Sequence, residues 1–431
     1  MSKSRIGSLM NVSTKQDYTN LTWILSRPFI DTGTSTHTEG SERRRRVYRL
    51  LRTWAMLEPL IVYGVLICMN ILLETLVLTP IRSITTVISC VCRRKPPTIV
   101  ERRDLNISAL FAAAILAIHI VNLATDVSYS YIYHIFRRQS YFKVFVLFNF
   151  VNVLDRLCSM FGCDLFHRAI ESDSLRSWKI VLADMGICVA YTVVHITVLY
   201  IQIVTLNVAV NSNQAELIVI LTSTNISEIK GGVLKKFSII NVFQILMGDI
   251  VERFQSVIMI GIICAHQVSV MEVSDLEEFS YRILFVFVWT VCLESAVDCV
   301  KHGFINRFNG ISPEIYKDYG VLLAYDQLQN QNLVSRRIGF VSLPLAAILM
   351  RGILQAFWRL YSSSVSFTGS TVIAIIFFLV FACLFTCKVL LQILLLGRSI
   401  SKVQYESENY NPQIWSGVER YKLNSKSLPA F

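Results

Sequence analysis

The residues of this chain most able to do chemistry are charged side chains inside long apolar stretches. Glu294 and Asp298 are four residues apart, so on a helix both side chains lie on one face. Arg351 lies near the middle of another apolar stretch and is the natural partner of these acids. Placing such a charge in lipid costs roughly 2.5–3.5 kcal/mol, so charged residues there usually have a role. The group is therefore either a structural ion pair between helices or part of a path for protons or ions.

Other ionisable side chains within the apolar stretches are Glu74, His119, Asp126, Asp184, His195, His266 and Lys388. A guanidinium group does not lose its proton in a protein, so Arg351 stays charged and requires an acidic partner. A buried acid can instead become neutral by taking up a proton. We expect Arg351 to approach an acid within the membrane, with Glu294 as the first choice and Asp184 or Glu74 next.

The sequence contains no other arrangement typical of an active site. It has no HExxH, GxSxG or glycine-rich dinucleotide motif, and "KGGVLKKF" lacks the spacing of a phosphate loop. Its 11 cysteines form no pair of CxxC elements, and Cys158, Cys163 and His167 lack a fourth metal ligand at a sensible spacing. We therefore expect neither an enzyme nor a bound metal or cofactor, and no small-molecule substrate is indicated.

The composition is that of a helical membrane protein. Of 431 residues, 53% are hydrophobic and only 16% are charged, whereas soluble proteins have about 25% charged residues. The apolar residues form continuous stretches rather than the alternating pattern of a membrane β-barrel. The net charge of +11 is spread between these stretches, which indicates the loop bias of a membrane protein and not a nucleic-acid surface. We predict an all-α, polytopic bundle of about six to eight membrane segments with amphipathic interfacial helices.

Three regions are expected along the chain. Residues 1–42 are rich in Ser, Thr and Asn without an apolar period, and we predict that they are disordered. Residues 43–400 form the membrane domain, and residues 401–431 form a cytosolic tail. Arg43 to Arg46 precede the first apolar stretch and either bind anionic membrane lipid or serve only as an orientation signal. The stretches long enough to cross a membrane are residues 57–79, 107–128, 180–206, 255–271, 281–299, 340–358 and 370–396.

Two apolar segments of the first half are too short to cross. "SITTVISCVC" follows Pro80, so we favour a re-entrant first segment over a plain crossing. "YFKVFVLFNFVNVL", which begins at Tyr141, is predicted to lie in the membrane interface. The polar stretch after it should fold into helices packed at the membrane surface. We expect Asp155 or Asp164 to pair there with a base such as Arg156 or with amides at a helix end.

Loop charges predict the orientation of the second half. Loop 272–280 has four acids and no base, so we place it in the lumen. Segments 211–253 and 300–338 then face the cytosol, and the glycosylation acceptor pattern at Asn225 is a chance match. An amphipathic helix on the membrane or against neighbouring helices is predicted from the helical spacing of Ile239, Phe243, Leu246, Ile250 and Phe254.

The polar segments between the spans follow a recognisable order, which is "YHIFRRQSYFKVFVLFNFVNVLDRLCSMFGCDLF", "TLNVAVNSNQAELIVILTSTNISEIKGGVLKKF", "DIVERF", "AVDCVKHGFINRFNGISPEIYKDYGVLLAYD" and "RRIGFVSLPLAAILMR". With the intervening spans they cover roughly residues 45–400, and they resemble the transmembrane anterior-posterior transformation protein family. Cys163 is a departure, because the family usually has Gln there. Candidate structural or interaction residues are Asp155, Arg156, Phe161, Gly162, Asp164, Asn207, Asn211, Glu228, Lys230, Gly231, Asp249, Glu252, Arg253, Glu294, Asp298, Lys301, His302 and Arg351.

The resemblance implies a multi-pass protein of the endoplasmic reticulum membrane. Fungal members of the family are associated with a partner that bears a lumenal SUN-like domain and with protection of newly made soluble proteins from degradation. Animal members are linked to cilium formation and skeletal patterning. We therefore expect a non-enzymatic scaffold or adaptor in protein folding or quality control that contacts membrane lipid and such a partner. The alternative is a transporter or channel that uses Glu294, Asp298 and Arg351.

Overall fold

The computed structural model describes residues 36–93, 96–125, 129–170, 178–211, 235–268, 276–329, 331–363, 367–406 and 418–421. The chain divides into two compact units, Met1–Arg52 and Thr53–Phe431, and all the side chains discussed below belong to the second. The first described helix begins at Thr36, so the predicted disorder of residues 1–42 does not extend over residues 36–42. Residues 1–35 lie outside the described part.

Every regular element in these ranges is a helix, which confirms the predicted all-α membrane bundle. The elements are α2 (Thr36–Leu73), the π-helical turn η1 (Glu74–Leu78), α3 (Thr79–Arg93), α4 (Ile99–Thr125), α5 (Tyr129–Arg137), α6 (Tyr141–Ile170), α7 (Trp178–Asn211), α9 (Ile239–Val268), α10 (Leu276–Asn309), α11 (Ile315–Gln329), α12 (Gln331–Ile338), α13 (Ser342–Ser363) and α14 (Phe367–Glu406). Among the described residues, the segments long and apolar enough to cross a membrane are Arg52–Cys92, Ile99–Ile120, Phe142–Phe166, Lys179–Asn211 and Thr371–Tyr405.

The first membrane segment is one continuous helix, so the predicted re-entrant hairpin is wrong. Helix α2 passes directly into η1, and η1 passes directly into α3, with no residue outside a helix between Thr36 and Arg93. The backbone N–H of Thr79 bonds to the carbonyl oxygen of Glu74, which is the wider spacing of a π turn. Proline cannot donate a backbone hydrogen bond, and this wider turn lies just ahead of Pro80. The chain therefore continues as a helix through the proline.

Helix α6 also differs from its prediction as an interfacial segment. The apolar stretch that begins at Tyr141 does not stop at its fourteenth residue, because the helix continues through the polar motif to Ile170. Its portion Phe142–Phe166 is long and apolar enough to cross a membrane. The polar side chains of the motif are tolerated within it because several of them bond to neighbouring helices, as described below. Hydropathy of the sequence alone therefore underestimated the length of this segment.

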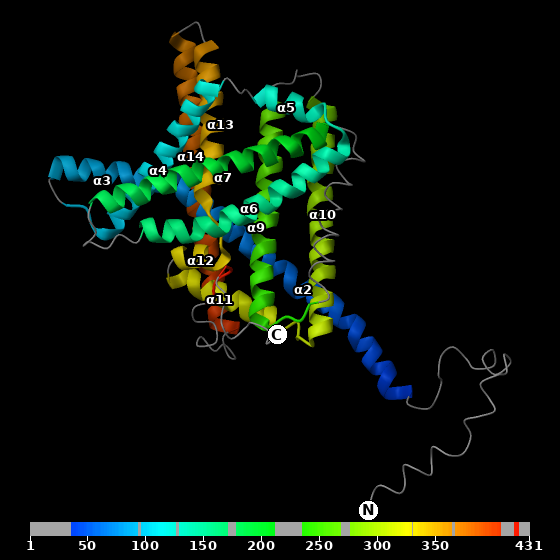
Figure 1. The fold of residues 1–431 in the computed structure, drawn as a ribbon. Helices are drawn as coiled ribbons and strands as arrows, with labels where there is room; N and C mark the ends of the chain where they lie inside the picture. Colours follow the sequence, from blue (N-terminus) through cyan, green and yellow to red (C-terminus); the bar gives the residue numbers. More distant parts are fainter. Residues whose placement is uncertain are drawn as a thin grey trace, which may run out of the picture. The chain divides into compact units, whose positions relative to one another are not determined.

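Helix α9 unites two elements that were predicted separately. The amphipathic helix and the span 255–271 are one helix, Ile239–Val268. The predicted apolar face is completely buried at Phe243, Leu246, Ile250 and Phe254, whereas its first member, Ile239, is exposed at the start of the helix. Figure 1 shows α9 and α10 side by side, with α6 and α7 running beside each other across α9. Helix α9 therefore lies at the centre of the core, where its polar residues must find partners.

A tight turn brings α11 back against α10. Gly310 has a φ of 66°, a backbone conformation that glycine adopts at little cost, and it directly follows the last residue of α10. The N–H of Ile311 bonds to the carbonyl oxygen of Asn306 at 3.0 Å, which closes the end of the helix. The turn places Tyr316 of α11 beside the last turns of α10. This position matters for the polar network.

The orientation of the second half can be tested by glycosylation mapping. Loop 272–280 should be lumenal because it carries acids and no base. We expect an acceptor site introduced near Leu276 to receive a glycan in microsomes, and the natural Asn225 to remain unmodified. Glycosylation is read as a mobility shift removed by an endoglycosidase. A glycan on Asn225 would reverse the orientation of the whole second half.

Candidate functional site

A buried network of charged side chains joins α9 to α10. The carboxylate of Asp249 on α9 lies 2.6 Å from Nζ of Lys301 and 2.9 Å from Nε2 of His302, both on α10. Nζ of Lys301 also lies 3.1 Å from a carboxylate oxygen of Asp298. All four side chains are almost completely buried. A buried charge is tolerated only when opposite charges and hydrogen bonds surround it, and each member of this group has such partners.

Arg253 extends this network to α2. Its Nε donates to Asp298 at 2.9 Å, and its Nη1 donates to Glu58 of α2 at 2.7 Å. The second carboxylate oxygen of Glu58 accepts a hydrogen bond from Ser295 of α10 at 3.1 Å. One guanidinium therefore connects three helices through two carboxylates. A lysine would offer a single nitrogen to both carboxylates, whereas the planar guanidinium presents separate donors in fixed directions.

Tyr316 connects α11 to the same network. Its hydroxyl lies 3.0 Å from Nδ1 of His302 and accepts a hydrogen bond of 3.0 Å from the side chain of Asn306. Burial raises the pKa of Tyr316, so the hydroxyl stays protonated and able to donate. With Nε2 of His302 donating to Asp249, hydrogen bonds run without a break from Asn306 through Tyr316 and His302 to Asp249. We call the group Glu58, Asp249, Arg253, Ser295, Asp298, Lys301, His302, Asn306 and Tyr316 the clamp network.

A second Asp–His–Tyr group joins α6 to α7. Asp155 lies 2.8 Å from Nε2 of His195, and Nδ1 of His195 lies 2.8 Å from the hydroxyl of Tyr191. That hydroxyl donates to the carbonyl oxygen of Cys158 at 2.6 Å. Asp155 therefore pairs with a basic side chain as predicted, but its partner is His195 and not the suggested Arg156. Adjacent residues on a helix point in directions about 100° apart, so the two side chains face different neighbours.

Arg156 pairs instead with Glu252 of α9, at 2.9 Å. The other predicted acid of this motif, Asp164, is exposed and forms no ion pair or hydrogen bond with a described residue. Phe161 is exposed as well, with 58% of its surface accessible. Of the α6 motif, the structure thus brings Asp155, Arg156 and Gly162 into contact with other helices, and leaves Phe161 and Asp164 on the surface.

Gly162 lets α7 approach α6 closely. A Cβ atom at this position would overlap the hydroxyl of Tyr191 and lie 2.8 Å from its Cζ and 3.1 Å from Val341. Tyr191 cannot move aside without losing its bonds to His195 and Cys158.

We therefore expect Gly162→Ala to destabilise the fold by about 1–3 kcal/mol through overpacking, despite the better helix propensity of alanine. The matched control is Gly186→Ala on α7, where a Cβ atom would meet nothing within 4 Å. That change should leave the melting temperature in detergent unchanged or raise it. Equal melting temperatures for the two variants would contradict the close packing at Gly162.

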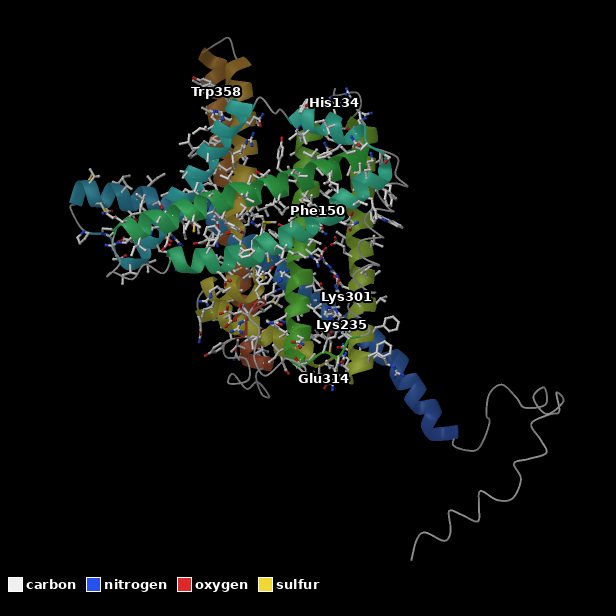
Figure 2. All side chains as sticks on the ribbon, viewed as in Figure 1. His134, Phe150, Lys235, Lys301, Glu314 and Trp358 are labelled. Carbon is white, nitrogen blue, oxygen red and sulfur yellow. The ribbon has the colours of Figure 1, made fainter. Side chains whose placement is uncertain are left out.

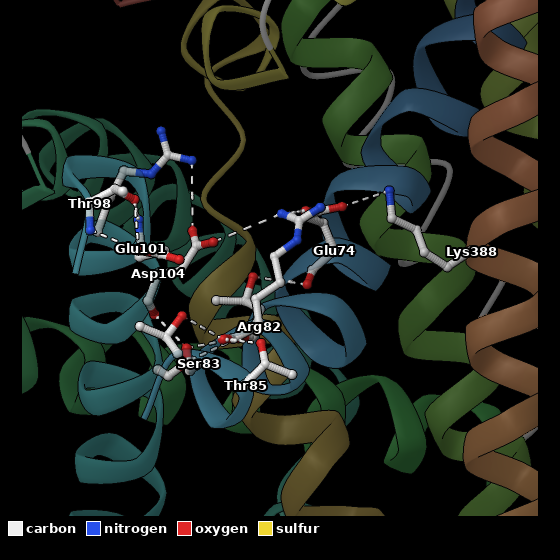
Figure 3. Close-up of polar contacts among 12 residues, drawn as sticks. Glu74, Arg82, Ser83, Thr85, Thr98, Glu101, Asp104 and Lys388 are labelled. Atoms are coloured by element: carbon white, nitrogen blue, oxygen red, sulfur yellow. Dashed lines mark hydrogen bonds and ion pairs between the residues drawn. The ribbon is translucent and has the colours of Figure 1, made fainter. Parts of the chain in front are cut away.

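A third buried ion pair links η1 to α14. Nζ of Lys388, which is completely buried, lies 2.8 Å from Glu74 and donates to Asn70 at 2.6 Å. Arg82 approaches the other oxygen of Glu74 at 2.6 Å. Figure 3 shows Glu74 between Lys388 on one side and Arg82 on the other, with Asp104 beyond Arg82. Glu74 and Lys388 are both ionisable residues that the apolar pattern singles out.

The predicted approach of Arg351 to an acid is wrong within the described residues. Arg351 is partly buried on α13 and forms no ion pair there, and the same holds for Glu294 on α10. Helix α13 packs against α7, α14, η1 and α4, whereas α10 packs against α9. The two residues lie on helices with different neighbours. Asp298 finds its partners in Arg253 and Lys301 instead.

Asn207 and Asn211 form a small polar group between α7 and α9. The side chain of Gln267 on α9 donates to both, at 2.9 and 2.7 Å, and Asn211 donates to Asn207 at 3.0 Å. The remaining candidates Glu228, Lys230 and Gly231 lie outside the described residues.

Sequence reasoning missed four members of the clamp network, namely Glu58, Ser295, Asn306 and Tyr316. The spacing on α10 contained a usable signal, because Asp298, His302 and Asn306 follow one another at intervals of four and so share one face of a helix. The place of Tyr316 in the network could not be predicted without the turn at Gly310. The place of Glu58 could not be predicted without knowing which helix packs beside α9.

The chain is similar to a group of eukaryotic membrane proteins. Residues 102–404 match DUF747, which is described as a eukaryotic membrane protein family. The transmembrane anterior posterior transformation protein 1 homolog of Gallus gallus is 34% identical over 86% of this chain and 65% of its own length. The homolog of Xenopus laevis is 33% identical over 90% of this chain and 72% of its own length.

A third relative, the protein TAPT1 homolog of Dictyostelium discoideum, is 30% identical over 84% of this chain and 45% of its own length. The chain spans about two thirds of the length of the two vertebrate relatives and about half that of the third. No solved structure matches the chain. The family model matches residues 102–404, and about one third of the residues are identical to those of the vertebrate relatives over most of the chain. Both findings agree with the order of the polar motifs and with the all-helical membrane fold. This chain belongs to the eukaryotic membrane protein family that contains the transmembrane anterior posterior transformation proteins.

Proposed function

We propose that this protein is a non-enzymatic, multi-pass scaffold or adaptor of the endoplasmic reticulum membrane that acts in protein folding or quality control. The observation that best supports the proposal is the clamp network, in which Arg253 holds Glu58 of α2 and Asp298 of α10 together. Charged side chains that keep the same partners are expected in a rigid bundle of helices. A carrier site has to release and rebind charge during its cycle, which needs groups that change partners.

The alternative of a transporter rested on Glu294, Asp298 and Arg351 acting together. The structure does not join these residues by ion pairs, and Asp298 is held by Arg253 and Lys301. The polar cavity beside the clamp network is lined by Asp249 and Lys301, and its lining includes neither Glu294 nor Asp298. We therefore favour the scaffold.

The scaffold should bind a membrane partner that carries a lumenal SUN-like domain, as the family resemblance implies. The same resemblance suggests a contribution to cilium formation in an animal setting. Contact with such a partner would leave the clamp network inside the bundle, where it holds the helices that present the binding surface.

The test is affinity purification of the tagged full chain from native membranes in a mild detergent. We expect a stoichiometric membrane protein with a lumenal SUN-like domain to co-purify, and not to co-purify with an unrelated multi-pass protein of the same membrane. Absence of such a partner, together with ion or solute flux after reconstitution into vesicles, would favour transport and contradict the scaffold.

A further inference from the structure

A polar cavity of about 420 Å³ lies beside the clamp network, lined by α6, α9, α10, Lys235 and the C-terminal residues Arg420 and Tyr421. Sites for small molecules usually enclose about 300–1,000 Å³, so the cavity can hold more than a single ion. Figure 2 shows Lys235 and Lys301 at the same end of α9 and α10. Segment 211–253 and the C-terminal tail are both predicted to face the cytosol, and so is this cavity.

The acids that line the cavity are already engaged by bases. Asp155 bonds to His195 at 2.8 Å, and Glu252 bonds to Arg156 at 2.9 Å. The third acid, Asp249, is held by the lysine and histidine of the clamp network. Their carboxylate oxygens are therefore already occupied by partners within the protein, which does not favour a cationic ligand.

Two lining cations have no such counterpart. Lys235 and Arg420 form no ion pair with any described residue, although both side chains line the cavity. The guanidinium of Arg420 lies against α9 at Gly248, where a Cβ atom would come within 3.3 Å of it. The absence of a side chain there leaves room for the guanidinium on the cavity wall. The cavity therefore carries surplus positive charge, contributed from two separate segments of the chain.

The C-terminal wall is held in place through hydrogen bonds to its own backbone groups. Arg337 on α12 donates from Nη1 to the carbonyl oxygen of Val418 at 2.7 Å and accepts from the N–H of Arg420 at 3.2 Å. Gln244 donates to the carbonyl oxygen of Glu419 at 2.9 Å. These bonds fix the backbone of Arg420, whose guanidinium lies 4.8 Å from the ring centroid of Tyr421 and forms no ion pair with a described residue.

The same wall contains polar atoms that the protein leaves unused. Nη1 of Arg420 and the hydroxyl oxygen of Tyr421 are buried and have no hydrogen-bond partner among the described residues. Buried polar groups are nearly always hydrogen-bonded, so two such atoms on residues that line the cavity call for a ligand or ordered water as their partner.

We propose that this cavity binds a phosphorylated polyol, with the phosphate between Lys235 and Arg420. A guanidinium and an ammonium together are the usual protein partners of a phosphate group. The remaining lining is rich in amides and hydroxyls that suit a ring of hydroxyl groups, namely Asn152, Ser159, Gln244 and Gln255. The headgroup of a phosphoinositide lipid and a free sugar or inositol phosphate share this chemistry. Such a ligand goes beyond the scaffold function and does not depend on it.

The test measures binding of inositol trisphosphate to the purified full chain by calorimetry, in detergent and in nanodiscs with or without phosphatidylinositol bisphosphate. Uncharged inositol serves as the ligand control. Arg420→Gln and Lys235→Gln should each weaken binding about tenfold or more, as expected for the loss of one charge-assisted contact. The matched protein control is Lys236→Gln, which removes the same charge at the neighbouring, exposed position that does not line the cavity.

Binding of the free inositol phosphate in detergent, lost in both cavity variants and retained in Lys236→Gln, supports a soluble ligand. Binding seen only as phosphoinositide retention in nanodiscs, with the same dependence on the variants, supports a lipid ligand. The proposal is overturned if neither form binds, or if all three variants weaken binding equally, because general surface charge would then explain it. Lys235 is exposed, so its variant tests the proposal even if the Arg420 variant fails to fold.

Discussion

Arg253→Leu is expected to destabilise the folded protein by about 3–5 kcal/mol, the usual cost of removing one partner from a buried ion pair. Arg253 is 7% exposed and holds carboxylates from two helices. Without it, the partners that remain among the described residues are Lys301 for Asp298 and Ser295 for Glu58. The change should appear as a marked fall in folded protein and as unfolding at lower denaturant in mixed micelles.

Two variants give the controls for this prediction. Arg156→Leu removes an arginine whose side chain is 47% exposed in its pair with Glu252, so the cost should stay below about 1 kcal/mol. Arg253→Lys keeps the charge but replaces the separate Nε and Nη1 donors by a single nitrogen, so its stability should fall between wild type and Arg253→Leu. If Arg253→Leu unfolds at the same denaturant concentration as Arg156→Leu, the clamp network does not hold the helices together.

Glu74→Leu should have a comparably large effect, about 3 kcal/mol or more. It leaves Lys388, which is completely buried in the last membrane segment, with only neutral partners such as Asn70 and Gln392. Replacing both members of the pair, as Glu74→Leu with Lys388→Leu, should recover most of the loss because no unpaired charge remains. Folded yield and the unfolding midpoint in mixed micelles measure both effects.

A double variant that is as unstable as Glu74→Leu alone would contradict a structural role for this ion pair. Lys388→Met serves as a further check, since Glu74 then still has Arg82, whose side chain is half exposed. We therefore expect Lys388→Met to be milder than Glu74→Leu. The ranking of the three variants by stability distinguishes the loss of an ion pair from a simple loss of packing volume.

The spacing of residues predicted the apolar architecture well. The helical recurrence of apolar residues predicted the buried face of α9, and all of its members except Ile239 are fully buried, namely Phe243, Leu246, Ile250 and Phe254. The ends of the helices were harder to predict from the sequence. Polar residues such as Asp155 interrupt the hydropathy of α6, and only their bonds to α7 and α9 explain how the helix continues as a candidate span.

The partners of the buried charges could not be derived from the sequence. Hydropathy identifies that Glu74, Lys388, Asp298 and Arg351 lie in apolar stretches, but it does not say which helices are neighbours. Asp298 pairs with Arg253 because α10 packs on α9, and Glu74 meets Lys388 because η1 packs on α14. The expected partner Arg351 lies on a helix with other neighbours. The cavity could not be predicted from the sequence for the same reason, because residues of α6, α9, α10 and the C-terminal segment line it together.

The most direct test of the scaffold compares partner binding by Arg253→Leu with that of the double variant Arg253→Leu and Asp298→Leu. In the double variant Lys301 still has Asp249, and Glu58, which is 27% exposed, still has Ser295 and water. We predict that the double variant regains folded yield and co-purifies the membrane partner at the wild-type ratio, with biological activity retained. A double variant that folds, reaches its membrane and binds its partner, yet is inactive, would contradict the scaffold and show that these charges carry out transport.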